Sequence, residues 1–202
     1  MTDAATKRTR LTPQARREHL LDCSAAMISE AGITAFTIEG LARQANVSVP
    51  LVYNYFTSRT ELLQDLLIRD FTRFNERTHD EIERASTFEE IVRAAVKSNF
   101  EHYAPGTVLP ILMRQAEIVS VIRDKLALNA RQASAYLVEQ TTAHYKLDHD
   151  TARLLVELSS GAAWSAAELA GRQNRNIEEV AELTVSYILA GIEALSERKH
   201  SQ

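Results

Sequence analysis

The chain has 202 residues, of which 45% are hydrophobic, 25% charged and 6% aromatic, and its formal net charge is −4. This apolar fraction is too high for a disordered chain, and 6 glycines and 4 prolines are too few for a fibrous or low-complexity protein. The single cysteine, Cys23, excludes an intrachain disulfide and a thiolate-rich metal site.

The spacing of the apolar residues predicts an all-α chain with about nine helices and no strand. The first helix is expected over 13–31, because Thr12 can cap its N-terminus and Gly32 can close its C-terminus. Thr37 can cap a second, short helix that ends at Gln44.

A third short helix is expected after Ser48, with Pro50 in its first turn. Thr60 is then expected to cap a long amphipathic helix over 60–85. Five further helices are expected to begin after Thr87 with Glu90, after Thr107, at about 121 (ending near 146), after Asp148 or Asp150, and after Asn176 with Glu179.

The charge is divided unevenly along the chain. Residues 1–60 contain seven Lys and Arg against five Asp and Glu, whereas the whole chain has a net charge of −4. A basic head on an acidic remainder is typical of a chain with one end that faces nucleic acid. Because residues 1–10 are polar and no apolar run is long enough to span a membrane, we expect a cytoplasmic protein.

The second and third short helices are separated by a tight turn. Small side chains at Ala42 and Ala45 allow the two helices to approach closely, and Val47 can fill the angle between them. Asn46 lies where the second helix must stop, and asparagine tolerates a positive φ. This arrangement is typical of a helix-turn-helix, whose second helix enters the major groove of DNA.

The same stretch resembles the DNA-binding signature of the tetracycline-repressor (TetR) family. The resemblance is carried by Gly32, Phe36, Thr37, Ile38, Leu41, Ala42, Ala45, Val47, Ser48, Val52, Tyr53, Tyr55, Phe56, Arg59 and Leu62. It implies an N-terminal arm and DNA-binding domain over 1–60 and a helical effector-binding and dimerisation domain over 61–202, joined by the helix at 60–85. Asn46, Pro50 and Arg59 stand where the family often has Gly, Gly and Lys.

The resemblance also implies a role for individual residues. Thr37, Tyr53, Tyr55 and Arg59 would contact phosphates. Three apolar residues and Asn54 would face the groove floor, and Asn54 could hydrogen-bond a base edge. The full set of expected DNA-contacting residues is Thr37, Arg43, Gln44, Ser48, Val49, Pro50, Leu51, Tyr53, Asn54, Tyr55 and Arg59.

In the remainder of the chain, the resemblance implies a mostly apolar effector pocket and a dimer interface on the last two helices. The candidate pocket residues are Phe71, Phe74, Phe100, His102, Tyr103, Met113, Arg114, Glu117, Tyr136, His144 and Trp164, although for each aromatic a place in the core is the stronger alternative. The candidate interface residues are Gly161, Ala162, Ser165, Ala166, Leu169, Ile188 and Ile192, although close packing inside one subunit would also use small residues.

The expected function is that of a ligand-responsive repressor, which binds a palindromic operator as a homodimer and is released by a small-molecule effector. The sequence carries no HExxH, GxGxxG, Walker or GxSxG motif, so we expect no enzyme, cofactor or metal site. Two other classes stay open: a helical enzyme or ligand carrier with a vestigial head, and a helical adaptor for protein partners.

Overall fold

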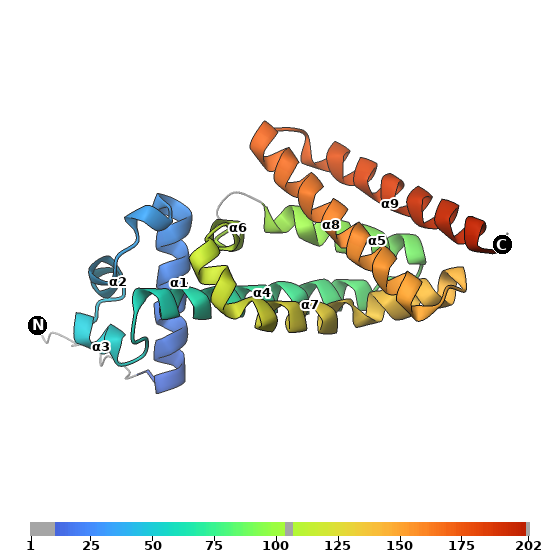
Figure 1. The fold of residues 1–202 in the computed structure, drawn as a ribbon. Coiled ribbons are helices and arrows are strands. Elements are labelled where there is room, and N and C mark those ends of the chain that lie inside the picture. Colours follow the sequence, from blue (N-terminus) through green and yellow to red (C-terminus); the bar gives the residue numbers. More distant parts are fainter. Residues whose placement is uncertain (1–10, 104–106, 201–202) are drawn as a thin grey trace, which may run out of the picture. The chain divides into compact units, whose positions relative to one another are not determined.

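The computed structural model describes residues 11–103 and 107–200, without the side chains of 198–200. These residues form nine α-helices, one 3₁₀ helix and no strand (Figure 1). The helices are α1 (Pro13–Ala31), η1 (Ile33–Ala35), α2 (Ile38–Gln44), α3 (Val49–Tyr53), α4 (Arg59–Glu83), α5 (Phe88–His102), α6 (Leu109–Met113), α7 (Ala116–Tyr145), α8 (His149–Gln173) and α9 (Ile177–His200).

Most helix ends lie where the capping residues predict them. The Thr12 hydroxyl accepts a hydrogen bond from the Ala15 amide at 3.2 Å, and Gly32 ends α1 with φ of +79°. Thr87 and Glu90 form the predicted reciprocal capping box of α5. Asp148, rather than Asp150, caps α8 by accepting from the Thr151 amide, and the Asn176 side chain accepts from the Glu179 amide at the start of α9.

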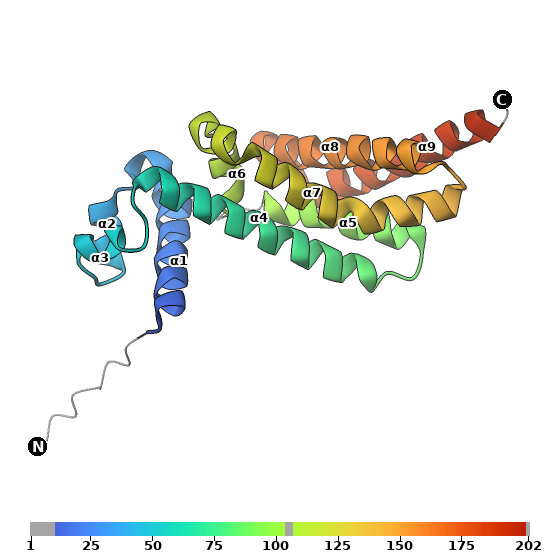
Figure 2. The same cartoon turned by 60° about the horizontal axis from the view of Figure 1, so that its bottom comes forward.

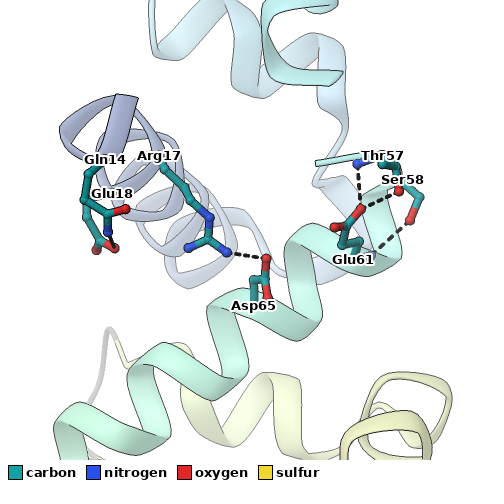
Figure 3. Close-up of polar contacts among 7 residues, drawn as sticks. All are labelled: Gln14, Arg17, Glu18, Thr57, Ser58, Glu61 and Asp65. Carbon is teal, nitrogen blue, oxygen red and sulfur yellow. Dashed lines mark hydrogen bonds and ion pairs between the residues drawn. The ribbon is translucent and has the colours of Figure 1, made fainter. Parts of the chain in front are cut away.

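The prediction that Thr60 caps α4 is wrong, because the cap lies two residues earlier in the chain. Ser58 caps this helix by accepting from the Glu61 amide at 3.0 Å, and the Glu61 carboxylate accepts from the Thr57 amide at 2.6 Å (Figure 3). Thr60 lies inside the helix instead. The sequence does contain the Ser-x-x-Glu pattern of a capping box here, but Thr60 is a competing candidate for the cap, and the Glu61 carboxylate bonds the amide one residue before Ser58.

One other helix boundary differs from the prediction, and one short helix is additional to it. The seventh helix begins at Ala116 rather than near 121, and it is preceded by the five-residue α6. The 3₁₀ turn η1 was not predicted, because three residues after a helix C-cap carry no usable periodicity.

The chain divides into two compact units, residues 1–66 and residues 67–202. The described part of unit 1 has its own core, to which α1, α2, α3 and the first turns of α4 contribute. The fully buried core side chains of unit 1 include Leu20, Leu21, Ile28, Leu41, Val52, Phe56, Leu62 and Leu63. The predicted division at 60/61 falls six residues before the boundary between the units, so α4 contributes residues to both.

In unit 2, α5, α7, α8 and α9 pack together (Figure 2). Their shared core is apolar and contains Val96, Phe100, Val138, Ala167 and Val185. The buried face of α8 carries several alanines, and the buried faces of α5, α7 and α9 carry valines. These small side chains allow the four helices to pack closely.

Candidate functional site

The turn between α2 and α3 is built by backbone hydrogen bonds that close the end of α2. The Val47 amide donates to the Ala42 carbonyl at 2.9 Å, and the Asn46 amide donates to the Arg43 carbonyl at 3.2 Å. Asn46 has φ of +54°, as the sequence predicts for a residue that ends this helix. These two bonds and the left-handed residue define a Schellman motif, which fixes the direction in which α3 leaves α2.

This geometry predicts the effect of two substitutions on stability. Asn46→Ala should lower the free energy of unfolding by about 1 kcal/mol, since alanine is strained at positive φ. Asn46→Gly should keep or slightly raise it, since glycine has no such strain. Urea denaturation of the full chain followed by circular dichroism measures both, and equal losses in the two variants would contradict this account.

The expected DNA-contacting residues lie together on α2, α3 and the segments that flank them. Eight of them are exposed: Thr37, Arg43, Gln44, Ser48, Pro50, Tyr53, Asn54 and Arg59. Val49, Leu51 and Tyr55 are partly buried. Tyr53 is 47% exposed although it is a large aromatic residue, whereas Phe56 is fully buried in the core.

Two of these residues also cap helices. The Thr37 hydroxyl oxygen accepts from the Gly40 amide at 3.0 Å, and the Ser48 hydroxyl oxygen accepts from the Leu51 amide at 3.3 Å. In both, the oxygen acts as acceptor within the protein, so the hydroxyl proton is available to an outside acceptor such as a phosphate oxygen.

Arg59 has a structural role that the sequence did not indicate. Its Nη2 donates to the Ile33 carbonyl at 2.8 Å and its Nε donates to the Phe36 carbonyl at 3.2 Å. The guanidinium carbon also lies 5.6 Å from the centre of the Phe36 ring. Arg59 therefore fastens the start of α4 to the segment that leads into α2.

A second arginine connects α1 with α4 inside unit 1. Arg17 forms an ion pair with Asp65 (Figure 3). Its guanidinium also lies 5.2 Å from the centre of the Phe56 ring. Arg17 thus ties α4 to α1, and Arg59 ties it to the segment between α1 and α2. No sequence pattern pointed to these pairs, because their partners are 48 and 23 to 26 residues away.

In unit 2 the structure brings five of the predicted pocket residues into one aromatic cluster. The His102 ring lies 4.7 Å from Phe74, 5.9 Å from Tyr103 and 5.5 Å from Trp164 between ring centres. Phe71 extends the cluster at 6.4 Å from Phe74. We call this group, Phe71, Phe74, His102, Tyr103 and Trp164, the aromatic cluster.

His102 is the unusual member of the aromatic cluster. Its side chain is buried, and its Nε2 has no hydrogen-bond partner among the described residues. Burial, together with the positive charge of Arg77, lowers the pKa of His102 from 6.5 to about 4. The ring is therefore neutral at physiological pH, and an unpaired polar atom is kept in the interior at a cost in stability.

A cavity of about 140 Å³ adjoins the aromatic cluster. Phe74 and His102 line it, as the sequence predicts, together with five residues that were not predicted: Arg77, Glu81, Ser98, Glu101 and Thr107. We call it the α4–α5 cavity, because six of the seven residues belong to these helices. Spacings of three and four residues place Phe74, Arg77 and Glu81 on one face of α4, a pattern that the sequence did contain.

The other predicted pocket residues lie elsewhere. Phe100 is in the core, Met113 is partly buried at the end of α6, and Glu117 is exposed. Arg114 pairs with Glu168 at 2.9 Å. His144 stacks on Phe88 at 4.7 Å, and Tyr136 meets His79 edge-on at 5.9 Å.

Two further hollows are present in unit 2. The one between α5, α7, α8 and α9 is lined mainly by apolar residues and holds only about 50 Å³. The other, of about 260 Å³, is an open groove between α4 and α7, and six of its seven lining residues are of polar types.

One face of α8 and α9 exposes large apolar side chains. They are Leu154, Leu158, Leu169, Leu183, Tyr187 and Leu195, with Leu183 and Tyr187 each 69% exposed. Of the predicted interface residues, Gly161, Ser165 and Leu169 lie on exposed positions and Ala162 and Ala166 are partly buried. Ile188 and Ile192 instead belong to the core of unit 2, because the buried face of α9 is turned toward α5 and α8.

The part of the chain that the structure describes has no helix long and apolar enough to cross a membrane. Within the same residues no group of three His, Cys, Asp or Glu side chains could hold a metal ion.

Comparison with known proteins decides the family. The family model described as bacterial regulatory proteins, tetR family, matches residues 20–66, which is most of unit 1. BetI, a helix-turn-helix transcriptional regulator of Rhizobium meliloti, is 28% identical over 194 residues, which cover 92% of this chain and 93% of BetI. The chain belongs to the TetR family.

Other relatives of this TetR-family chain match it over different lengths. The transcriptional repressor KstR of Rhodococcus jostii is 37% identical over 62 residues, which span only 29% of KstR and 31% of this chain. A TetR-like transcriptional regulator from Rhodococcus sp. RHA1 has the same fold, with a TM-score of 0.61, 18% identity and coverage of 91% of this chain and 99% of that one.

The FadR regulator of Bacillus subtilis, solved in complex with stearoyl-CoA, also has this fold. The TM-score is 0.67 at 17% identity, over 86% of this chain and 98% of FadR. At this identity the likeness concerns the fold alone.

The residues that match the family model, 20–66, include α2 and α3. In this TetR-family chain these two helices are the helix-turn-helix of a DNA-binding transcriptional regulator, and unit 2 lies outside the matched residues.

Proposed function

We propose that this TetR-family regulator represses transcription by binding a palindromic operator as a homodimer, and that a small-molecule effector bound in unit 2 releases it. The observation that carries the proposal is the exposed set of polar and aromatic residues around α2 and α3, on a turn fixed by its own backbone bonds. The exposed apolar face of α8 and α9 supports the homodimer.

The proposed DNA contacts divide into two groups. Thr37, Tyr53, Tyr55 and Arg59 contact the phosphate backbone, as hydroxyl or guanidinium donors. Asn54, at the C-terminal end of α3, has the side chain best suited to a base edge, since a carboxamide can pair with adenine through two hydrogen bonds. Val49, Pro50 and Leu51 offer apolar contact to thymine methyl groups, and Arg43, Gln44 and Ser48 contribute from the end of α2 and the turn.

A second copy of the chain is the proposed cover for the apolar face of α8 and α9. Leu154, Leu158 and Leu169 on α8 and Leu183, Tyr187 and Leu195 on α9 supply the contact. A Cβ added at Gly161 or Gly191 would meet no atom of the described chain within 4 Å, so packing inside the protomer requires neither glycine. Glycine within a helix costs about 1 kcal/mol relative to alanine, and close approach of a second helix would offset this cost.

Release by the effector follows from differential binding. The effector would favour a form of the dimer in which the two recognition helices no longer fit major grooves about one helical turn (~34 Å) apart. Operator and effector then compete through one conformational equilibrium. Helix α4 contributes residues to both units and is the proposed connection.

Selection from random-sequence duplex DNA at moderate salt, with the mass of the protein measured alongside, tests the proposal. Enrichment of one palindrome bound by a dimer supports it. Salt-sensitive binding without an enriched sequence, or a monomer on the enriched site, contradicts it.

The division of the DNA contacts predicts two different mutational phenotypes. Tyr53→Phe should weaken binding to all duplexes by a similar factor, about fivefold, because a phosphate contact carries no sequence information. Asn54→Ala should lower the preference for the selected site over single-base variants by about tenfold or more at one position. Competition binding with those variants measures both, and an equal loss of preference in the two proteins would refute the division.

A further inference from the structure

The size and lining of the α4–α5 cavity indicate which class of effector it could bind in unit 2. The α4–α5 cavity holds about 140 Å³, room for roughly ten water-sized groups. A long acyl chain such as that of stearoyl-CoA exceeds this volume several-fold, and the apolar hollow beneath α8 and α9 is smaller still. The cavity therefore suits a compact molecule of about ten non-hydrogen atoms.

The walls of the α4–α5 cavity carry charges of both signs. Arg77 and Glu81 lie four residues apart on α4 and both line it. Neither forms an ion pair or hydrogen bond with another described residue, although this spacing permits a pair on a helix. Glu101, by contrast, already pairs with Lys97 at 3.4 Å. One guanidinium and one carboxylate are thus left to pair with a ligand.

The remaining walls are polar or aromatic without further charge. His102 is 92% buried, is neutral, and leaves its Nε2 without a partner. The Ser98 hydroxyl is hydrogen-bonded to that of Thr78, and the Thr107 hydroxyl donates to the His102 carbonyl. A buried, unpaired ring nitrogen is unfavourable in the empty protein, and a hydrogen bond with a ligand would satisfy it.

We propose that the effector is a small zwitterion of amino-acid size, whose carboxylate pairs with Arg77 and whose ammonium group pairs with Glu81 in the α4–α5 cavity beside His102. This inference rests on the proposed function, because it names the ligand class of the same effector site. A guanidinium can bind a carboxylate through two parallel hydrogen bonds, and a carboxylate accepts strong bonds from an ammonium group. Phe74 and His102 line the cavity where the rest of the molecule would lie.

The structure provides its own reporter for a binding experiment. Trp164 is the chain's only tryptophan, and its ring centre lies 5.5 Å from that of His102. The full-length protein is titrated with each of the standard L-α-amino acids, and both Trp164 emission and the thermal midpoint are recorded, so that binding without an optical change is still detected. Stearoyl-CoA is tested as a ligand of a different class.

We expect at least one amino acid to bind at up to millimolar concentration. Its carboxamide, which lacks the negative charge, and its N-acetyl derivative, which lacks the positive charge, should each bind at least about tenfold more weakly. Arg77→Gln should remove the preference for the acid over the carboxamide, and Glu81→Gln should remove the preference for the amine over the N-acetyl derivative. Arg153→Gln and Glu157→Gln, which change the same charges on exposed α8 positions, should preserve both preferences.

Three results would overturn the zwitterion proposal: no amino acid binds by either readout, a singly blocked derivative binds as tightly as its parent, or Arg77→Gln and Glu81→Gln leave both preferences intact. Failure of the proposed function is separate, since it is read from DNA. If a palindrome is selected but no amino acid binds, the repressor proposal stands and the ligand class is wrong. If an amino acid binds but no DNA sequence is enriched, the ligand class is right and the repressor proposal is wrong.

Discussion

A Leu158→Arg/Leu183→Arg variant is expected to be monomeric and to lose operator affinity by about 100-fold or more. Both leucines are exposed in the protomer, at 60% and 69%, so the free energy of folding of the protomer depends little on them. Because an isologous interface uses the same surface of both subunits, it would bury four arginines per dimer, and buried like charges are strongly unfavourable. The affinity loss follows because two linked half-site contacts bind far more tightly than one.

The matched control for this variant is Leu128→Arg. Leu128 is 54% exposed and lies on α7, which is not one of the two helices that carry the apolar face. It should leave both the mass in solution and the operator affinity unchanged. Sedimentation and fluorescence anisotropy measure the two quantities, and a Leu158→Arg/Leu183→Arg protein that stays dimeric would exclude this face as the interface.

His102→Phe is expected to make the protein less sensitive to acid. The unfolded histidine titrates near its ordinary pKa of 6.5, whereas burial and Arg77 lower the pKa in the folded protein to about 4. Above pH 6.5 the ring is neutral in both states and the shift contributes nothing. Between pH 6.5 and pH 4 the histidine binds a proton in the unfolded chain but not in the folded one. The free energy of unfolding therefore falls as the pH falls, by up to about 3 kcal/mol.

The His102→Phe substitution replaces the titratable imidazole with an aromatic ring that binds no proton. At pH 7 the free energy of unfolding should be equal to or higher than that of the parent protein, since an unpaired buried nitrogen is lost. At pH 4.5 the variant should be more stable than the parent by about 2 kcal/mol. Urea denaturation at both pH values measures the difference.

The control here is His149→Gln, which changes an exposed histidine at the first residue of α8. It should retain the acid sensitivity of the parent protein. A stability difference between His102→Phe and the parent that does not change with pH would show that His102 titrates normally in the folded state.

Local sequence predicted unit 1 closely because its elements depend on short-range signals. Thr12, Thr37 and Ser48 each accept a hydrogen bond from the amide three residues ahead, which starts a helix. Gly32 and Asn46 adopt a positive φ, which ends one. Each of these helix ends therefore depends on a few neighbouring residues. The one wrong cap, at α4, arose where Ser58 and Thr60 offered competing hydroxyls and Glu61 decided between them.

Long-range pairs could not be read in the same way. Arg59 has the features of a phosphate ligand, but its position in the sequence does not show that its Nη2 and Nε also donate to the carbonyls of Ile33 and Phe36. Ile188 and Ile192 lie on the same helix as Leu183 and Tyr187. From the sequence, all four are equally plausible residues for a dimer interface. Which of them is buried depends on how α9 is rotated against α5 and α8.

The sequence by itself determined the all-α class, nearly all of the helix ends and the helix-turn-helix, since periodicity and capping act over three or four residues. Only the tertiary structure decided which side chains meet. It joined Phe74, His102 and Trp164 from three helices, left Arg77 and Glu81 facing a cavity, and separated the exposed leucines of α8 and α9 from the buried isoleucines. Such contacts are set by the packing angles of whole helices, to which many distant residues each contribute a little.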